Sequence, residues 1–179
     1  LAFSEHFEVV GFDIDIDRIT SLNNSVDSNG DQEIIENRNV TFTGDFDDLK
    51  DANVYIITVP TPVNSDNVPD LDNLKSATTM VANFINIGDI VIYESTVYPG
   101  VTEDICVPLL EKGSSLSYNL DFFCAYSPER ISPGTKEYTL RNVVKIVSAS
   151  NNDILDEVDV LYRKIITAGT YKAPSIRVA

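Results

Sequence analysis

The sequence predicts an α/β protein built on a Rossmann-like doubly wound parallel sheet. Short apolar runs alternate with stretches that carry a helical stripe. The runs are continuous rather than alternating, as in the segment NVYIITV at residues 53–59, and this is typical of strands buried on both faces. Polar residues gather directly after several of these runs, where open parallel sheets bind their ligands.

Taken in order, the apolar runs predict the strands of this sheet. We expect strands at residues 8–13, 40–43, 53–59, 89–93, 120–126 and 143–148, followed by a short extended piece at 168–173. The Pro60-Thr61-Pro62 segment ends the third of these runs. Strands that alternate with helices favour a parallel, doubly wound sheet.

Helical spacing fills the gaps between the strands. Residues 1–4 are expected to end a helix, and further helical segments are expected at residues 16–24, 46–50, 71–85, 103–112 and 154–166. Gly88 lies just past the helix expected at 71–85, and Ser150, Asn151 or Asn152 can cap the helix expected at 154–166. Pro108 falls inside the helix at 103–112, so it should kink this helix or shift its start.

The glycine-rich turn that normally precedes the second strand of a dinucleotide-binding sheet is not found, because Gly11 and Gly30 do not form it. The chain also starts at Leu1 rather than at a methionine. We therefore expect the first strand of the sheet, which is central in the order 3-2-1-4-5-6, to be missing from this sequence and present in the complete protein.

Composition narrows the classes of function. The 179 residues are 43% hydrophobic and 23% charged, the balance of one globular domain. Asp and Glu outnumber Lys and Arg by 28 to 13, giving a net charge of −15, which repels nucleic acid. No apolar run approaches the ~20 residues of a membrane span, so we expect a cytoplasmic protein. Cys106, Cys124 and His6 lack metal-ligand spacing, so both thiols are expected in the core and no metal is predicted.

Four polar signals follow predicted strands, and each has a plain structural alternative. Asp13, with Arg18 nearby, can accept hydrogen bonds from the ribose of NAD, although acids often follow strands. Thr61 can point into a crevice or stiffen a turn, and Ser95-Thr96 can bind a cofactor or satisfy turn backbone. Glu129-Arg130 offers a general base and an anion ligand, or an ordinary surface pair.

Three motifs, in this order, resemble those of a known family. VPTP at 59–62, ESTVYPGVTE at 94–103 and YSPERISPG at 126–134 are similar to the UDP-sugar 6-dehydrogenases of the UDP-glucose/GDP-mannose dehydrogenase superfamily. The PER-x-x-PG form looks more like the UDP-N-acetylhexosamine branch than the PEFLREG of the UDP-glucose branch. The resemblance implies an NAD-binding domain over residues 1–173, incomplete at its N-terminus, and the start of the central interdomain helix at 174–179.

The resemblance also implies a chemistry: oxidation of C6 of a UDP-sugar from alcohol to carboxylate with two NAD⁺ in turn, for polysaccharide biosynthesis. Glu129 and Thr96 match catalytic positions; Asp13, Arg18, Thr61 and Thr96 match cofactor contacts; Arg130 and Ile131 match substrate contacts. The UDP-glucose branch has a second acid at the position of Pro133, so a two-acid mechanism is not expected. The family's nucleophilic cysteine would lie beyond Ala179, so this chain alone should be inactive.

The residues leave other interpretations open. The full-length protein could be a UDP-glucose 6-dehydrogenase, a non-catalytic nucleotide-binding module, or an NAD enzyme of the 6-phosphogluconate or hydroxyacyl dehydrogenase type. The PER-x-x-PG loop argues against the last. By resemblance, the complete protein should be a homodimer or larger, and the identity of its UDP-sugar is left open.

Overall fold

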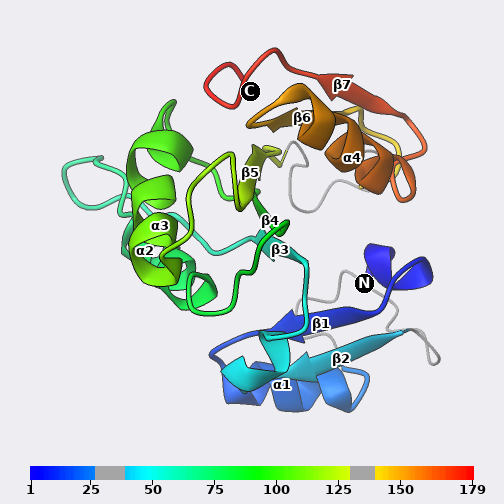
Figure 1. Ribbon diagram of the computed structural model, residues 1–179. Coiled ribbons are helices and arrows are strands. Elements are labelled where there is room, and N and C mark those ends of the chain that lie inside the picture. The colour runs from blue at the N-terminus through cyan, green and yellow to red at the C-terminus, as the bar shows by residue number, and fades with distance from the viewer. Residues whose placement is uncertain (27–38, 130–139) are drawn as a thin grey trace. The chain divides into compact units, whose positions relative to one another are not determined.

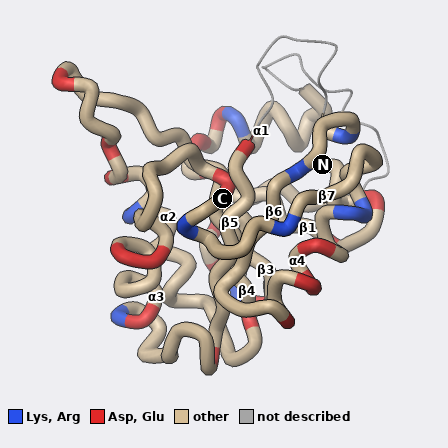
Figure 2. Tube along the Cα trace, turned by 90° about the horizontal axis from the view of Figure 1, so that it is seen from above, with Lys and Arg blue, Asp and Glu red and all other residues tan. Residues whose placement is uncertain are grey.

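The computed structural model describes residues 1–26, 39–129 and 140–179 (Figure 1). The chain forms two compact units, Leu1–Ala52 and Asn53–Ala179, which are described separately. Asp and Glu positions occur in many segments of the described chain rather than in a single one (Figure 2).

The first unit is a two-stranded parallel sheet with short helices. It contains the 3₁₀ turn η1 (Ala2–Glu5), β1 (Val9–Phe12), α1 (Ile16–Asn23), β2 (Val40–Thr43) and the 3₁₀ turn η2 (Phe46–Leu49). β1 and β2 pair in parallel from Val9 opposite Val40. Asp15 caps α1, because its side chain accepts hydrogen bonds from the backbone N–H groups of Asp17 and Arg18. All five elements lie where the sequence predicts them.

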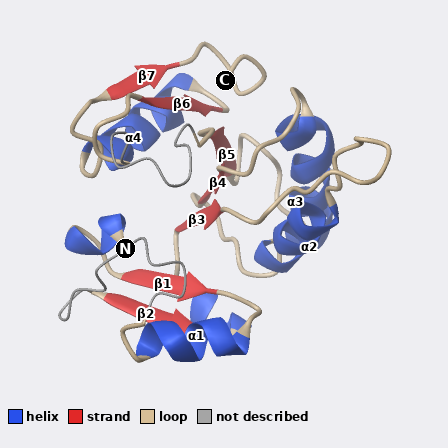
Figure 3. Ribbon diagram, turned by 180° about the vertical axis from the view of Figure 1, so that it is seen from behind, coloured by secondary structure: helices blue, strands red, loops and turns tan. Residues whose placement is uncertain are grey.

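The second unit is a five-stranded sheet in the order β3-β4-β5-β6-β7. Its elements are β3 (Val54–Ile57), α2 (Asp72–Val81), β4 (Ile90–Tyr93), the π-helix η3 (Val101–Cys106), α3 (Val107–Ser114), β5 (Phe123–Tyr126), β6 (Lys145–Ala149), α4 (Asn152–Arg163) and β7 (Thr170–Lys172). Figure 3 shows α2 and α3 on one side of β3, β4 and β5, and α4 against β6 and β7. All four residues of β4 are buried, as its continuous apolar run predicts.

One strand pair in the described residues departs from the parallel arrangement. β6 pairs with β5 in the antiparallel direction, with Tyr126 opposite Ser148, whereas the other strand pairs are parallel. The sequence between these two strands contains Pro128, Pro133 and Gly134 and carries no helical stripe. A parallel neighbour needs a crossover, usually a helix, so the chain returns antiparallel instead.

The sheets otherwise agree with the α/β prediction. Among the described residues, no strand pairs with the second edge of β1 or with the second edge of β3. At the other end of the chain, residues 174–179 form a turn in which the Ala179 N–H donates to the Ser175 carbonyl at 3.2 Å. That an interdomain helix begins there stays a prediction.

Pro108 divides the helix expected at 103–112, as predicted. The chain first makes the wider π-helical turns of η3 and then the α-helical turns of α3, which has Pro108 near its start. Proline has no N–H to donate, so one helical hydrogen bond is missing at Pro108. The Val107 N–H just before it donates to the Thr102 carbonyl five residues back, and the change of helix type falls at the proline.

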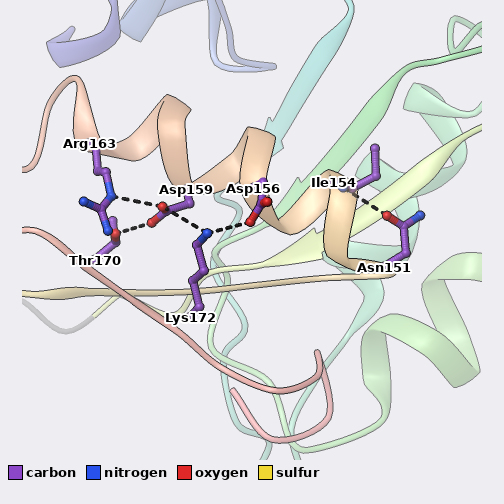
Figure 4. A network of polar contacts seen from close by, with 7 residues as sticks. All are labelled: Asn151, Ile154, Asp156, Asp159, Arg163, Thr170 and Lys172. Carbon is purple, nitrogen blue, oxygen red and sulfur yellow. Dashed lines mark hydrogen bonds and ion pairs between the residues drawn. The ribbon is translucent and has the colours of Figure 1, made fainter.

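Figure 4 shows the polar network that holds the edge strand β7 to α4. The Asp159 carboxylate is buried and accepts hydrogen bonds from the Thr170 hydroxyl and from Arg163 Nε at 3.0 Å, with Lys172 Nζ 3.3 Å away. Lys172 Nζ also lies 2.6 Å from Asp156. Burial pushes the pKa of Asp159 upward, but the three donors together outweigh burial and lower this pKa. The network is structural.

Gly100 is a position where a side chain should be costly. Its φ is +97°, and a Cβ atom would lie 2.6 Å from Asp104 Oδ2 and 3.2 Å from Arg177 Nη2. Gly88 has almost the same φ, +96°, but open space around it. We expect Gly88→Ala to lower the free energy of unfolding by about 1–2 kcal/mol, the cost of the left-handed conformation, and Gly100→Ala to lower it further. Urea denaturation measures both values, and equal losses would show that the Asp104–Arg177 contact does not matter.

Candidate functional site

Three neighbouring strands end at the same level of the sheet. Ile57 of β3 lies opposite Tyr93 of β4, which lies opposite Tyr126 of β5. The ladder continues one residue further, because the Glu94 N–H donates to the Ile57 carbonyl at 2.9 Å and the Ser127 N–H donates to the Tyr93 carbonyl at 2.9 Å. The three polar loops that follow therefore leave the sheet at one edge, as the sequence predicts.

Two hydroxyl hydrogen bonds join the loops after β3 and β4. The buried Ser95 hydroxyl donates to the Val59 carbonyl, and the Thr61 hydroxyl donates to the Thr96 carbonyl, both at 2.6 Å. The structural interpretation thus holds for Ser95, and Thr61 also has a structural role. The Thr96 residue is exposed. These bonds fix the backbone that presents the Thr96 side chain at the strand end.

A buried lysine connects the loops after β4 and β5. Lys145 Nζ lies 3.1 Å from Glu94 Oε1 and 3.4 Å from Glu129 Oε2. The Tyr162 hydroxyl donates to the same Glu94 oxygen at 2.6 Å, and the Tyr162 ring centre lies 5.6 Å from Lys145 Nζ. We call Glu94, Glu129, Lys145 and Tyr162 the Lys145 cluster. It combines one cation with two carboxylates at the edge where the predicted site lies.

Tyr162 acts as a hydrogen-bond donor in this cluster. Burial, followed by the nearby Glu94 charge, raises the pKa of Tyr162 well above its ordinary value. The phenol therefore keeps its proton at neutral pH and donates a hydrogen bond to Glu94. Beside it, the fully buried Ser127 hydroxyl donates to the Ile146 carbonyl at 2.7 Å, which ties the end of β5 to β6.

The first unit carries the predicted ribose contacts. Asp13 directly follows β1, and its Oδ1 accepts a hydrogen bond from the Asp15 N–H at 3.0 Å. Arg18 lies in the first turn of α1. Both residues are partly exposed. Arg130 and Ile131, predicted to contact the substrate, lie outside the described residues.

The cysteines are core residues, as predicted. Cys106 and Cys124 are fully buried and not in a disulfide, and burial raises the pKa of both thiols. Within the part of the chain that the structure describes, no group of His, Cys, Asp and Glu could hold a metal ion. In the same part, no helix is both long and apolar enough to cross a membrane.

The three strand ends and their polar loops form one edge of a Rossmann-like sheet, and comparison with known proteins specifies the family. The model of the UDP-glucose/GDP-mannose dehydrogenase family, NAD binding domain, matches residues 1–166. The chain belongs to this family. The predicted family and the predicted cofactor class of this domain, NAD, are thereby confirmed.

Individual members of the UDP-glucose/GDP-mannose dehydrogenase family show the same likeness. UDP-N-acetyl-D-glucosamine 6-dehydrogenase of Salmonella typhi is 49% identical over 180 residues, which cover 99% of this chain and 42% of that protein. The structure of the UDP-D-ManNAc dehydrogenase from Pyrococcus horikoshii matches with a TM-score of 0.87 at 30% identity, covering 99% of this chain and 44% of its own. A ternary complex of GDP-mannose dehydrogenase from Pseudomonas aeruginosa, 22% identical with a TM-score of 0.85 over 99% of this chain and 43% of its own, shares the fold. The chain spans less than half the length of these relatives.

Sequence reasoning missed the centre of the Lys145 cluster. Lys145 is a single charged residue inside the apolar run VVKIV, and this was the available signal, because a lysine is seldom buried without a partner. Tyr162 falls within the apolar stripe of the helix predicted at residues 154–166, and this pattern predicts only that the residue is buried. Its hydrogen bond to Glu94 spans 68 positions of the chain, and no local pattern predicts such a contact.

Proposed function

We propose that this chain is the NAD-binding part of a UDP-N-acetylhexosamine 6-dehydrogenase, an oxidoreductase that converts the C6 alcohol of the sugar to a carboxylate with two NAD⁺. The observation that carries the proposal is that Thr61, Thr96 and Glu129 follow three adjacent, in-register parallel strands. The relatives named above act, by their names, on UDP-N-acetyl-D-glucosamine and UDP-D-ManNAc. A cytoplasmic location, a role in polysaccharide biosynthesis and assembly as a homodimer or larger belong to the same proposal.

The side chains present fit the cofactor. Asp13 stands at a strand end with Oδ1 bound to one backbone N–H, and a carboxylate there can accept hydrogen bonds from ribose hydroxyls. Arg18, in the first turn of α1, is a proposed contact for the adenosine ribose, and Thr61 and Thr96 are further proposed cofactor contacts. When bound, NAD⁺ accepts the hydride from C6.

The residues at the sheet edge would handle the water. The Glu129 side chain is 39% exposed, so its carboxylate can reach a water molecule and act as the base when the thioester intermediate is hydrolysed. The exposed Thr96 hydroxyl would help to hold that water. Arg130 and Ile131 would begin the loop that contacts the nucleotide sugar. Cys106 and Cys124 are buried in the core, so the thiol that captures the aldehyde would come from another part of the protein.

The test is an assay of NADH formation by the protein at the length of its relatives. With UDP-N-acetylglucosamine, UDP-N-acetylmannosamine or UDP-N-acetylgalactosamine we expect two NADH for each sugar consumed. The 179-residue chain alone should form none, while circular dichroism shows that it is folded. Turnover of UDP-glucose alone would favour the UDP-glucose alternative, and NAD⁺ binding without turnover of any sugar would favour the non-catalytic module.

A further inference from the structure

Lys145 is placed at the site by the antiparallel pairing that the sequence did not predict. Ala125 lies opposite Ala149, and Tyr126 lies opposite Ser148. If this register is continued past the end of β5, Glu129 lies opposite Lys145, the first residue of β6. Had β6 run parallel to β5, its first residue would lie at the other end of the sheet. The reversal therefore brings a cation to the edge that carries Glu129.

The exposed fraction of the charged side chains in the Lys145 cluster increases from the core toward the solvent. The exposed fraction of the side chain is 4% for Lys145, 17% for Glu94 and 39% for Glu129. A buried ammonium group is costly unless it is paired, and here two carboxylates pair with it. Glu94 is held in turn by the Tyr162 hydroxyl. Glu129 is thus the outermost group of an arrangement whose other members are fixed by burial and by hydrogen bonds.

We propose that Lys145 is a positioning residue for the reaction: its buried ammonium group, anchored on Glu94, holds the Glu129 carboxylate at the strand end where water is activated. This inference rests on the function proposed above for Glu129. Glutamate has three rotatable side-chain bonds, so an unanchored Glu129 would sample many positions. A fixed contact at Oε2 limits the positions that the carboxylate can take. Misplacing a catalytic group by about 1 Å can cost about 10²-fold in rate.

The alternative is that Lys145 only stabilises the fold, and kinetics can separate the two roles. In the full-length protein the hydride transfers precede hydrolysis. Loss of positioning at Glu129 should therefore preserve a rapid burst of two NADH per site and slow the turnover that follows. A stabilising residue would instead change the amount of folded protein and leave the rate of each folded site unchanged.

The experiment measures the burst and the subsequent turnover of the full-length protein with UDP-N-acetylglucosamine and NAD⁺. We expect Lys145→Met to keep the burst and to slow later turnover about 10–100-fold. Lys145→Arg should recover part of the loss. Lys172→Met is the matched control, because Lys172 also bridges two carboxylates, but these belong to α4 (Asp156 and Asp159) and not to the loops after β4 and β5. Its turnover should equal wild type. If Lys145→Met does not fold, Lys145→Gln, which keeps a hydrogen-bond donor without the charge, takes its place.

A double variant identifies the residue through which Lys145 acts. Glu129→Gln alone tests the proposed function, and Lys145→Met/Glu129→Gln should be no slower than Glu129→Gln alone, because no carboxylate remains to be positioned. Wild-type turnover in Glu129→Gln would refute the proposed function. Slow turnover in Glu129→Gln together with normal turnover in the folded Lys145 variant would refute only the role of Lys145, as would independent, multiplicative losses in the double variant.

Discussion

Under the proposed function, replacing Glu129 by glutamine is expected to slow steady-state NADH formation by the full-length protein about 10²–10⁴-fold, the usual contribution of a general base. Glutamine has nearly the same shape but cannot accept a proton from water. The burst of two NADH should remain, because hydride transfer does not need this carboxylate. The fold should also survive, since Glu94 still provides Lys145 with a counter-charge at 3.1 Å.

The matched control for this substitution is Glu157→Gln. Glu157 is an exposed residue of α4, and the substitution makes the same change in charge and shape outside the loops that follow β3, β4 and β5. Rapid-quench and stopped-flow absorbance measurements give the burst and the steady rate separately. A Glu129→Gln enzyme that loses the burst as well would assign the residue to the oxidation steps, and one with a normal steady rate would remove it from the mechanism.

Most of the fold could be predicted because its elements are encoded locally. The apolar run that forms β4 is buried at every position, Asn151 caps α4 through a hydrogen bond to the Ile154 N–H, and Pro108 marks the change from η3 to α3. The direction of β6 could not be predicted from periodicity, because a buried strand has the same pattern whether it runs parallel or antiparallel. Only the lack of a helical stripe in the sequence after Ser127 pointed to the reversal.

The site divides in the same way. The places of Thr61, Thr96 and Glu129 just after strand ends could be predicted, because each follows an apolar run; their roles in binding and catalysis stay predictions. The contacts of Lys145 could not be predicted. Its contact with Glu129 depends on the antiparallel register, and its contact with Glu94 joins β6 to a loop that is distant in the sequence. The hydrogen bond from the Thr61 hydroxyl to the Thr96 carbonyl is of the same kind, since it links residues 35 positions apart.

Replacing Asp13 by asparagine should weaken NAD⁺ binding to the full-length protein about 10–100-fold. Hydrogen bonds to a charged acceptor are worth about 1.5–3 kcal/mol, and the neutral amide retains only part of this for the ribose hydroxyls. Asparagine keeps an oxygen for the Asp15 N–H, so the turn between β1 and α1 should be preserved. Calorimetric titration with NAD⁺ measures the change in Kd.

The coenzyme NADP⁺ makes this prediction specific to a ribose contact. A carboxylate repels the extra phosphate on the adenosine ribose, so Asp13→Asn should weaken NAD⁺ binding while leaving NADP⁺ binding unchanged or improved. Asp17→Asn, an exposed acid in the first turn of α1, removes the same charge four residues away and should leave the ratio of the two affinities at its wild-type value. If both variants shift the ratio of the two affinities toward NADP⁺ to the same extent, the acid acts through the general field of the first unit and not at the ribose. A change in the ratio confined to Asp13→Asn requires direct contact, because a charge effect through solvent would act on both positions.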